Sequence, residues 1–454
     1  MKAINSYVVD EKLVSDVSAS IADKNSKYLN KLIDHLRAAD LADLIEHLKP
    51  EERMYLFEML EPEGAGEVLV EIEAPIQGSI LNDLDNAAIT EIVQELDSDD
   101  AADLVGDLPA DRAKDIIETL EDDVTEDLEK LLPYEEDSAG GIMALEFISV
   151  KENISIQEAI DTIRENREEV ENLYYLYVVD DFNRLVGVVS LKDLVLEPSD
   201  KKINEIMNPE VISVDLERDQ EEVANLVKKY DLVSIPVVDE YNRLVGRITH
   251  DDIIDVLEEE ADEDISLMGG IIHQEISEDS YIKISRARLP WLIIGLVFGI
   301  AAATVTKIFE GSIEKMIALT FFIPVVMAMG GNAGTQASTV AVRGLATGDI
   351  SLVNVGRRLF IEMKAAVVNG LICGFLLGII VYFFEGNIGL GCVAATSLIL
   401  IIIISGFIGA GVPLLLKRMN IDPALATGPF VTTSNDILSL LIYLGLVTLF
   451  LDFL

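Results

Sequence analysis

Near the C-terminus, one carboxylate stands inside a long apolar stretch. It is Asp436, in the segment Gly428-Pro-Phe-Val-Thr-Thr-Ser-Asn-Asp436. An ionised side chain inside hydrocarbon is costly unless it is compensated, so it marks a functional position. The Gly-Pro pair loosens helical hydrogen bonding. The hydroxyls of Thr432 and Thr433, the amide of Asn435 and the freed carbonyls are hard oxygen ligands that suit Mg²⁺ or its water shell. The alternative is a structural carboxylate satisfied by its neighbours.

A second polar motif interrupts another apolar stretch. It reads Met329-Gly-Gly-Asn-Ala-Gly-Thr-Gln336. Its small residues allow a neighbouring helix to approach closely, and helix packing alone would explain the glycines. The side chains of Asn332, Thr335 and Gln336, beside Gly331, could also line a wet path for an ion.

Ligand chemistry narrows the choice of ion. No His or Cys cluster of the kind that soft metals prefer surrounds Asp436, and all four His residues lie in the other half of the chain. Cys373 and Cys392 both lie in apolar runs, which excludes a disulfide framework and a Cys-based zinc site. One carboxylate with neutral oxygens suits Mg²⁺, which keeps much of its water. Because one acidic position is little for a complete pore, we expect a two-fold dimer with both copies near its axis.

The chain after Leu289 contains five apolar stretches, each near the roughly 20 residues that a helix needs to cross a bilayer. We place these spans at about Leu289–Phe309, Met316–Gly344, Phe360–Phe384, Leu390–Leu416 and Ala424–Phe453. Basic residues flank them mainly on the side of the N-terminal part: Lys283, Arg286, Arg288, Arg343, Arg357, Arg358, Lys364, Lys417 and Arg418. The positive-inside rule therefore predicts a multi-pass protein of the plasma membrane, with a cytoplasmic N-terminus and an external C-terminus.

Charge is distributed very unevenly along the 454 residues, whose formal net charge is −46. Up to Ser280 there are 72 acidic and 23 basic residues, giving −49, and the rest holds 8 and 11, giving +3. An acidic half repels phosphate, which argues against a nucleic-acid partner. The first thirty residues contain no apolar core behind a basic start, so we expect no cleavable signal peptide.

A leucine repeat organises the first part of the acidic half. Leucine or isoleucine recurs every twelve residues at Leu36, Leu48, Leu60, Ile72, Leu84, Leu96, Leu108, Leu120 and Leu132. A polar turn and then apolar residues at helical spacing follow most of them. The pattern predicts stacked short helices that form an α-superhelix.

A second repeat follows it. Leu176-Tyr-Val-Val-Asp-Asp-Phe-Asn-Arg-Leu-Val-Gly187 recurs 59 residues later as Ile235-Pro-Val-Val-Asp-Glu-Tyr-Asn-Arg-Leu-Val-Gly246. Each copy predicts a strand, a helix, an apolar strand, an Asp/Asn turn, a strand and a helix. The two units resemble tandem CBS domains, including the Gly-x-x-Ser/Thr-x-x-Asp signature. That resemblance implies a nucleotide site, for ATP or another adenine nucleotide, at Ser190, Asp193, Thr249 and Asp252.

A connecting helix between the second unit and the membrane carries one face of carboxylates. Asp251, Asp255, Glu258, Glu259 and Asp262 fall on that face at helical offsets. Like charges at such spacing destabilise a helix, so something should neutralise them. Mg²⁺ shared with Asp97 and Asp100 of the superhelix, or with Asp215 and Glu217 of the second CBS unit, would do so. The alternative is an ordinary solvated acidic face.

Taken together, the order of the motifs resembles the MgtE family of magnesium channels and transporters. The most specific marks are the motif ending at Gln336 and the segment Asp422 to Asp436. The expected domains are an α-superhelix (1–137), two α/β CBS units (138–200 and 201–257), an acidic connecting helix and linker (251–282) and an all-α membrane domain of five helices (283–454). The resemblance implies a homodimer in which cytosolic acids bind Mg²⁺ and close the pore, with the connecting helix as plug and Asp436 as the ion site.

The predicted function is therefore Mg²⁺ uptake across the plasma membrane, closed by Mg²⁺ on the cytosolic domains. Two alternatives stay open at this point: transport of another divalent ion such as Co²⁺ or Mn²⁺, and a membrane-anchored nucleotide sensor. We expect no enzyme, because the sequence shows no phosphate-binding glycine loop, no paired His ligands and no Ser/Cys–His arrangement.

Overall fold

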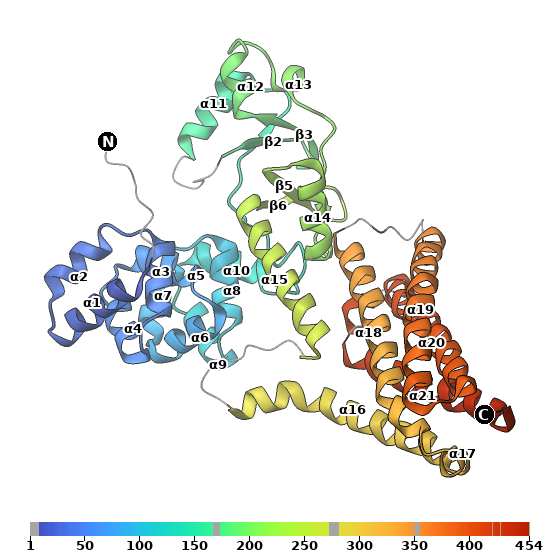
Figure 1. Cartoon of the computed structure of the whole chain (residues 1–454). Helices are drawn as coiled ribbons and strands as arrows, with labels where there is room; N and C mark the ends of the chain where they lie inside the picture. Colours follow the sequence, from blue (N-terminus) through green and yellow to red (C-terminus); the bar gives the residue numbers. More distant parts are fainter. Residues whose placement is uncertain are drawn as a thin grey trace. The chain divides into compact units, whose positions relative to one another are not determined.

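The computed structural model of the chain describes residues 9–166, 173–271, 281–347, 350, 355–419, 421–426 and 428–453. It divides into two compact units, Met1–Glu259 and Glu260–Leu454, which are considered separately below (Figure 1). The division falls inside one helix, so that this helix contributes residues to both units.

The first unit begins with ten short helices that follow the twelve-residue repeat. They are α1 (Glu11–Ala22), α2 (Ser26–Ile33), α3 (Ala38–Glu46), α4 (Pro50–Phe57), α5 (Pro62–Val70), α6 (Ala74–Asp83), α7 (Asn86–Val93), α8 (Ser98–Gly106), α9 (Ala110–Ile117) and α10 (Asp122–Leu131). From α3 onward, each helix starts twelve residues after the previous one. The repeat leucine stands two residues before each start, as Leu48 does before Pro50, and its side chain is mostly buried. The predicted helical repeat is therefore confirmed.

Alternate helices of the repeat pack on one another: α3 on α5, α5 on α7, α7 on α9, and α8 on α10. Pro50 and Pro62 open α4 and α5, where a missing backbone N–H leaves no hydrogen bond unmade. The apolar core of the helices includes Leu104 and Leu128 and continues into the following α/β part through Ile248. The superhelix and the second CBS unit thus pack together.

Two three-stranded sheets with the same topology follow the superhelix. Their strands are β1 (Ser149–Lys151), β2 (Tyr175–Val179) and β3 (Leu185–Ser190) in the first sheet, and β4 (Val214–Asp215), β5 (Ser234–Val238) and β6 (Leu244–Thr249) in the second. In each sheet the first strand pairs parallel with the second, and the second pairs antiparallel with the third. Four helices complete this part: α11 (Ile156–Glu165), α12 (Leu191–Leu196), α13 (Ile203–Ile206) and α14 (Gln220–Tyr230).

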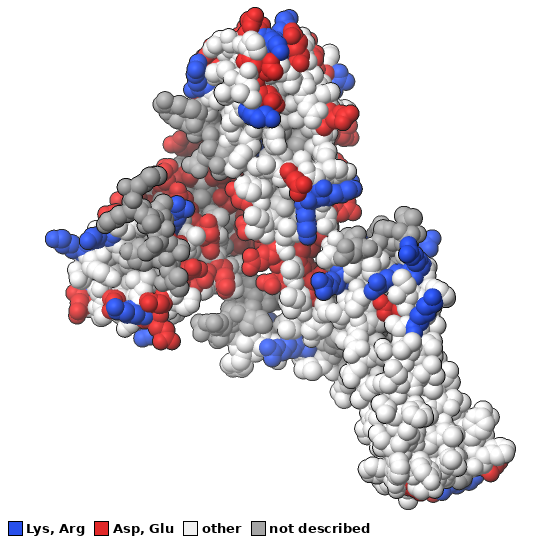
Figure 2. Space-filling view, turned by 45° about the horizontal axis from the view of Figure 1, so that its top comes forward, with Lys and Arg blue, Asp and Glu red and all other residues white. Residues whose placement is uncertain are grey.

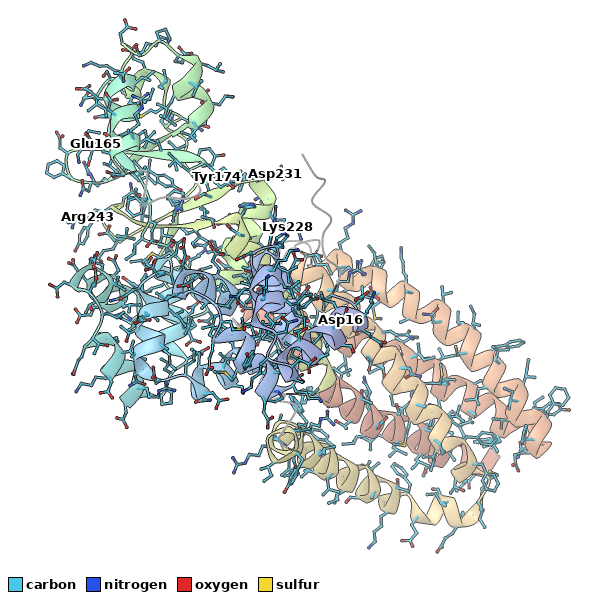
Figure 3. All side chains as sticks on the ribbon, turned by 90° about the vertical axis from the view of Figure 1, so that its left-hand side faces the viewer. Asp16, Glu165, Tyr174, Lys228, Asp231 and Arg243 are labelled. Atoms are coloured by element: carbon cyan, nitrogen blue, oxygen red, sulfur yellow. The ribbon has the colours of Figure 1, made fainter. Side chains whose placement is uncertain are left out.

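The tips of the two antiparallel hairpins bind each other. Asn183 and Asn242 adopt positive φ angles of 61° and 62° at equivalent turn positions. The Leu185 N–H donates to the Asn242 carbonyl at 2.9 Å, and the Leu244 N–H donates to the Asn183 carbonyl at 3.2 Å. Arg243, labelled in Figure 3, lies beside this junction with its guanidinium 5.0 Å from the centre of its neighbouring tyrosine ring. The repeated Asp/Asn turns therefore join the two units as a pair.

The pairs Ile142-Met143 and Ile206-Met207 precede equivalent segments of the two α/β units, and their methionines have a structural role. A Cβ on Gly246 would lie 2.6 Å from the Met143 sulfur, and a Cβ on Gly187 would lie 2.6 Å from the Met207 sulfur. Each methionine therefore packs on the glycine of the Gly-x-x-Ser/Thr-x-x-Asp signature, which leaves no room for a larger residue there.

The connecting helix α15 (His250–Gly269) starts directly after β6. It ends at Gly270, whose φ of 73° is the left-handed conformation that closes many helices. The expected connecting segment 251–282 is helical up to residue 269, and its residues 272–280 lie outside the described part of the chain.

The second unit contains the apolar helices. Their bounds are α16 (Tyr281–Ile308), α17 (Glu310–Lys315), α18 (Leu319–Ala346), α19 (Val355–Glu385), α20 (Ile388–Arg418), the 3₁₀ helix η2 (Pro423–Ala426), α21 (Pro429–Phe450) and the 3₁₀ helix η3 (Leu451–Phe453). Helix α20 packs against α18, α19 and α21, and α18 also packs against α21 (Figure 1).

Four helical segments of the described residues are long and apolar enough to cross a membrane: Ile284–Ile308, Val355–Glu385, Ile388–Arg418 and Pro423–Phe453. The predicted second span, Met316–Gly344, corresponds to α18 but is not among them, because its glycines and amides lower its mean hydropathy. The first helix begins at Tyr281, earlier than predicted. The predicted fifth span is divided at Gly428, whose φ is 58°.

Candidate ion pathway and carboxylate cluster

Helices α18 and α21 approach each other through the predicted glycines. A Cβ on Gly334 would collide with the side-chain amide of Asn435, and one on Gly330 would collide with the Ser439 hydroxyl. On α20, a Cβ on Gly409 would collide with the carbonyl of Gly334. The glycines therefore permit close helix packing, as the sequence suggests.

Asp436 lies two turns inside α21, where it is the eighth helical residue. The break in the chain is at Gly428, and the Thr432 hydroxyl donates to its carbonyl at 2.9 Å. A Cβ on Gly331 would lie 3.7 Å from an Asp436 carboxylate oxygen, and the hydroxyl oxygens of Thr335 and Thr432 are 3.3 Å apart. These five residues thus form one polar contact between α18 and α21, in which Asp436 belongs to a regular helix and not to a loosened turn.

Asn435 occupies a different environment from Asp436. Its side chain is fully buried, and neither its amide nitrogen nor its amide oxygen has a hydrogen-bond partner among the described residues. The hydroxyls of Ser439 and Ser405 are in the same situation. Asn435 therefore packs inside the helix interface in this structure. The hydroxyl of Thr433, one turn from the start of α21, lies 3.4 Å from the Phe430 carbonyl.

Asn332 and Gln336 line a groove of about 480 Å³ between α18, α19 and α20. The groove also holds Glu362 and Asn369 of α19. Sequence reasoning grouped Asn332 and Gln336 with Asp436 and treated Asp436 as the one acidic position of the spans. Glu362 is a second carboxylate within the predicted third span, and the polar residues divide between two sides of α18.

Basic side chains gather at one end of the second unit (Figure 2). Arg343 lies at the end of α18, Arg357 and Arg358 at the start of α19, and Lys417 and Arg418 at the end of α20. Because α18, α19 and α20 follow one another in antiparallel order, these five predicted basic residues lie at a common end.

In the first unit, carboxylates from three places face one another. They come from α8, from Glu146 in the segment before β1, and from the start of α15. The Ser98 backbone N–H and hydroxyl donate to Glu146 at 3.1 and 2.8 Å, which holds this glutamate against α8. Figure 2 shows how densely acidic side chains occupy the visible face of this unit.

The pKa values of these carboxyl groups are raised. Burial, and then the nearby Asp252 and Asp97 carboxylates, raise the pKa of Asp100 to about 7. Burial and the Asp100 carboxylate raise the pKa of Asp103 to about 7, with Glu259 contributing. Both burial and like charge disfavour the ionised form.

Their neighbours show the same effect. Burial raises the pKa of Asp99 well above its usual value, and the carboxylates of Asp100 and Asp252 add to it. Burial also raises the pKa values of Glu146, Asp252 and Asp255. We call these seven residues the carboxylate cluster: Asp99, Asp100, Asp103, Glu146, Asp252, Asp255 and Glu259.

The predicted sensor residues separate into three groups. Asp97, Asp100, Asp251, Asp255, Glu258 and Glu259 lie in or next to the carboxylate cluster. Asp215 and Glu217 lie in the exposed turn between β4 and α14, where Asp215 is 4.0 Å from Arg218. Asp262 is exposed on the part of α15 that belongs to the second unit.

Among the described residues, no three His, Cys, Asp or Glu side chains are arranged to ligate one metal ion directly.

The predicted nucleotide residues cap helices. The Ser190 hydroxyl donates to Asp193 at 2.6 Å at the start of α12. The Thr249 N–H and hydroxyl both donate to Asp252 at 2.8 Å at the start of α15. Tyr174, labelled in Figure 3 and directly before β2, meets the His250 ring edge to face, with the ring centres 5.8 Å apart. Asp252 thus belongs both to a helix cap and to the carboxylate cluster.

Some residues of these sites escaped the sequence analysis. Glu146 has no local motif, because only the packing of its segment on Ser98 brings it to α8. Glu362 and Asn369 carry the same signal that identified Asp436, a polar side chain inside an apolar span, and could have been found by it.

The comparisons with known proteins cover most of the chain. The family described as "Divalent cation transporter" (MgtE) matches residues 323–446, the MgtE intracellular N domain matches 36–137, and CBS domains match 139–200 and 203–259. The magnesium transporter MgtE of Thermus thermophilus is 41% identical over 328 residues, 72% of this chain and 73% of the relative. That of Bacillus subtilis is 40% identical over 326 residues, 71% of this chain and 72% of the relative. A crystal structure of the cytosolic domain of the Mg²⁺ channel MgtE in complex with ATP has a TM-score of 0.51 and 35% identity, covering 54% of this chain and 99% of that one.

The raised pKa values predict how stability depends on pH. An Asp whose folded pKa lies above its unfolded pKa binds more protons when folded, so its contribution is favourable at low pH and is lost as pH rises toward about 7. With a chelator present to remove divalent cations, the melting temperature of a fragment of residues 1–271 should fall by several degrees between about pH 5.5 and about pH 8. Added Mg²⁺ should restore it at the higher pH. The Asp100→Asn variant should flatten this dependence and the control Asp215→Asn should not, and a melting temperature that rises with pH would contradict the arrangement.

Proposed function

The chain belongs to the MgtE family and transports Mg²⁺, and from this premise we propose how the ion passes and how its passage is controlled. Mg²⁺ passes Asp436, and the cytosolic carboxylates sense Mg²⁺ and close the path. The observation that carries the control mechanism is the carboxylate cluster, in which burial and mutual repulsion raise the pKa values of acids from α8 and α15.

The ion site at Asp436 rests on the contact between α18 and α21. Gly331 lies beside the Asp436 carboxylate, and the hydroxyls of Thr335 and Thr432, 3.3 Å apart, belong to the same contact between the helices. These are hard oxygen ligands, and a single carboxylate among them suits a cation that keeps most of its water. The proposed pathway also includes four polar residues that do not contact Asp436 directly: Asn332, Gln336, Thr433 and Asn435. The first two line the groove beside α18.

We expect Asp436→Asn to reduce Mg²⁺ flux strongly while leaving the fold intact. Removing the charge removes the electrostatic attraction for a divalent ion, and a loss of about tenfold or more should follow. The measurement is Mg²⁺ flux into liposomes that carry the purified protein. Asp452→Asn, a change of an exposed carboxylate in η3, directly after α21, is the control and should transport normally. Equal flux in both variants would remove Asp436 from the pathway.

The proposed assembly is a homodimer in the plasma membrane with five spans and an external C-terminus. The basic residues at one end of the second unit support the orientation, and the small number of carboxylates inside the spans of one chain, Asp436 and Glu362, supports the pairing of two chains. Light scattering of the purified protein would measure its mass, and protease accessibility of a C-terminal tag in intact cells would test the orientation.

The proposed plug is the C-terminal part of α15. Its Leu267 packs with Val342 at the end of α18 and with Ala424 in η2. A Cβ on Gly428 would collide with the Met268 carbonyl, so the end of α15 lies against the break that precedes α21. This position supports a role in closing the path, since Asp436 stands two turns further along α21.

The proposed sensor acts through charge. With little Mg²⁺, the ionised carboxylates of α8 and α15 repel one another and the closed arrangement loses stability. With more Mg²⁺, hydrated ions between them compensate the repulsion. Because an ion shifts a conformational equilibrium only by its preference for one state, several ions are needed for a steep response. The number of carboxylates in the cluster meets that requirement.

Neutralising the cluster should change the Mg²⁺ dependence of closing. Asp100→Asn and Asp255→Asn together remove the two partners of a cation on α8 and α15. The cytosolic Mg²⁺ concentration that halves the flux should therefore differ several-fold between this double variant and the wild type. The matched control is Asp215→Asn with Glu217→Gln, two exposed acids outside the cluster. If the control shifts the curve as much as the cluster variant, dispersed charge and not the cluster is the sensor.

A nucleotide site at the CBS pair is the second part of the regulation that we propose. The relative crystallised with ATP is 35% identical, and Ser190 with Asp193 and Thr249 with Asp252 keep the signature residues at two equivalent helix starts. ATP titrated into the purified protein should bind, and Asp193→Asn or Asp252→Asn should weaken binding about tenfold. The variant that does so identifies the unit that holds the nucleotide, and no binding in the wild type would contradict the proposal.

Transport of Co²⁺ or Mn²⁺ on the same scaffold is tested by competition against Mg²⁺ in the flux assay. A nucleotide sensor that transports nothing is set aside by the family to which the chain belongs.

A further inference from the structure

The groove between α18, α19 and α20 is a distinct site of the second unit. Helices α18 and α19 form its walls, and Ile402 and Gly406 of α20 form its floor. Its volume is about 480 Å³. Six waters at about 30 Å³ each occupy about 180 Å³, so a cation with its first water shell fits inside.

Four polar side chains face this groove: Asn332 and Gln336 from α18, and Glu362 and Asn369 from α19. Asn332 stands in the middle of the 28-residue α18, and Asn369 stands near the middle of the 31-residue α19. Amides and a carboxylate at such depth cannot be satisfied by lipid chains. Water, an ion or protein must therefore cover them.

Pairing within the described residues leaves most of these groups open. Glu362 accepts one hydrogen bond, from Arg358 at 2.7 Å. None of the three amides hydrogen-bonds to another described residue. The remaining oxygens are one carboxylate oxygen and three amide oxygens, which is the hard donor set that divalent cations with a water shell prefer.

We propose that this groove is a second station for a hydrated divalent cation, held by Glu362 with Asn332, Gln336 and Asn369. The cation keeps its inner waters, in keeping with the absence of a direct metal-ligating cluster among the described residues. This inference rests on the proposed function, because it extends the ion pathway from Asp436 across α18. Gly331 lies on the side of α18 that faces Asp436, and the next residue, Asn332, faces the groove.

Arg358 competes with the cation for Glu362. Arg358 and Glu362 stand one helical turn apart and form an ion pair whose side chains are partly exposed. Such pairs contribute little to stability. A divalent ion therefore displaces the guanidinium at modest cost. When the ion leaves, Arg358 returns and keeps the carboxylate compensated.

Cys373 lines the same groove and reports on its contents. In a Cys392→Ala background it is the remaining cysteine of the chain. The full-length protein in lipid nanodiscs is treated with a cationic, membrane-impermeant methanethiosulfonate reagent, with and without Mg²⁺. We expect Cys373 to react and Mg²⁺ to slow the reaction about tenfold. Glu362→Gln should raise the Mg²⁺ concentration for half protection about tenfold, and Asp436→Asn should leave it unchanged.

Several results would overturn the inference. A thiol that reacts after unfolding but never in the folded protein means that lipid or a second copy fills the groove. Reaction without protection means a wet groove without a cation station. If Mg²⁺ protects Cys373 equally in the wild type and in Glu362→Gln, or if Asp436→Asn abolishes this protection, the Mg²⁺ that protects the thiol is bound at another site. Should Glu362→Gln lower the melting temperature, Asn369→Ala replaces it, with a several-fold shift expected.

Flux is measured on the Cys392→Ala protein in parallel. Normal flux without Mg²⁺ protection of Cys373 would overturn this inference alone, whereas absent flux in that protein and in wild type would contradict the proposed function.

Discussion

Repulsion between crowded carboxylates is the main constraint on the first unit. The acids of α8, Glu146 and the start of α15 are brought together by an apolar core that includes Leu104, Ile248 and Val256. Packing keeps these carboxylates close together although their charges repel, and desolvation and this repulsion raise the pKa values of Asp100 and Asp103 to about 7. Cations that relieve this repulsion stabilise the packed arrangement, so stability and ion binding are linked by the same interaction.

The membrane unit meets a different constraint, because its helices must satisfy polar groups without water. Gly330, Gly334 and Gly409 bring backbones close enough for α18, α20 and α21 to pack directly. Their closeness leaves the Asn435 amide inside the interface and the Asp436 carboxylate at its edge beside Gly331. The glycines therefore determine which polar group is enclosed and which can reach an ion.

Local sequence patterns predicted the repeats well. The twelve-residue spacing of the leucines and the two Asp/Asn turns each reflect short-range chemistry that repeats within the chain. The clusters were less predictable, since Glu146 reaches α8 only through tertiary packing and the acidic residues are so frequent that spacing alone cannot rank them. Asp215 and Glu217 are exposed for this reason, although their residue type was suitable. Glu362 lies outside the motif around Asp436, and spacing alone does not indicate that Asn332 faces the groove with it, because the sequence does not show which neighbour a helix face meets.

Helix α15 also fixes the angle about its axis between side chains near its two ends. Its 20 residues form one uninterrupted helix, with Asp255 in the cluster near one end and Leu267 in an apolar contact near the other. Each residue turns the helix by about 100°, so the angle between these two side chains is set by the number of residues that separate them. Inserting or deleting one residue between them would change this angle by about 100°, whereas a change of seven residues would nearly preserve it. The length of this segment is therefore constrained by angle as well as by distance.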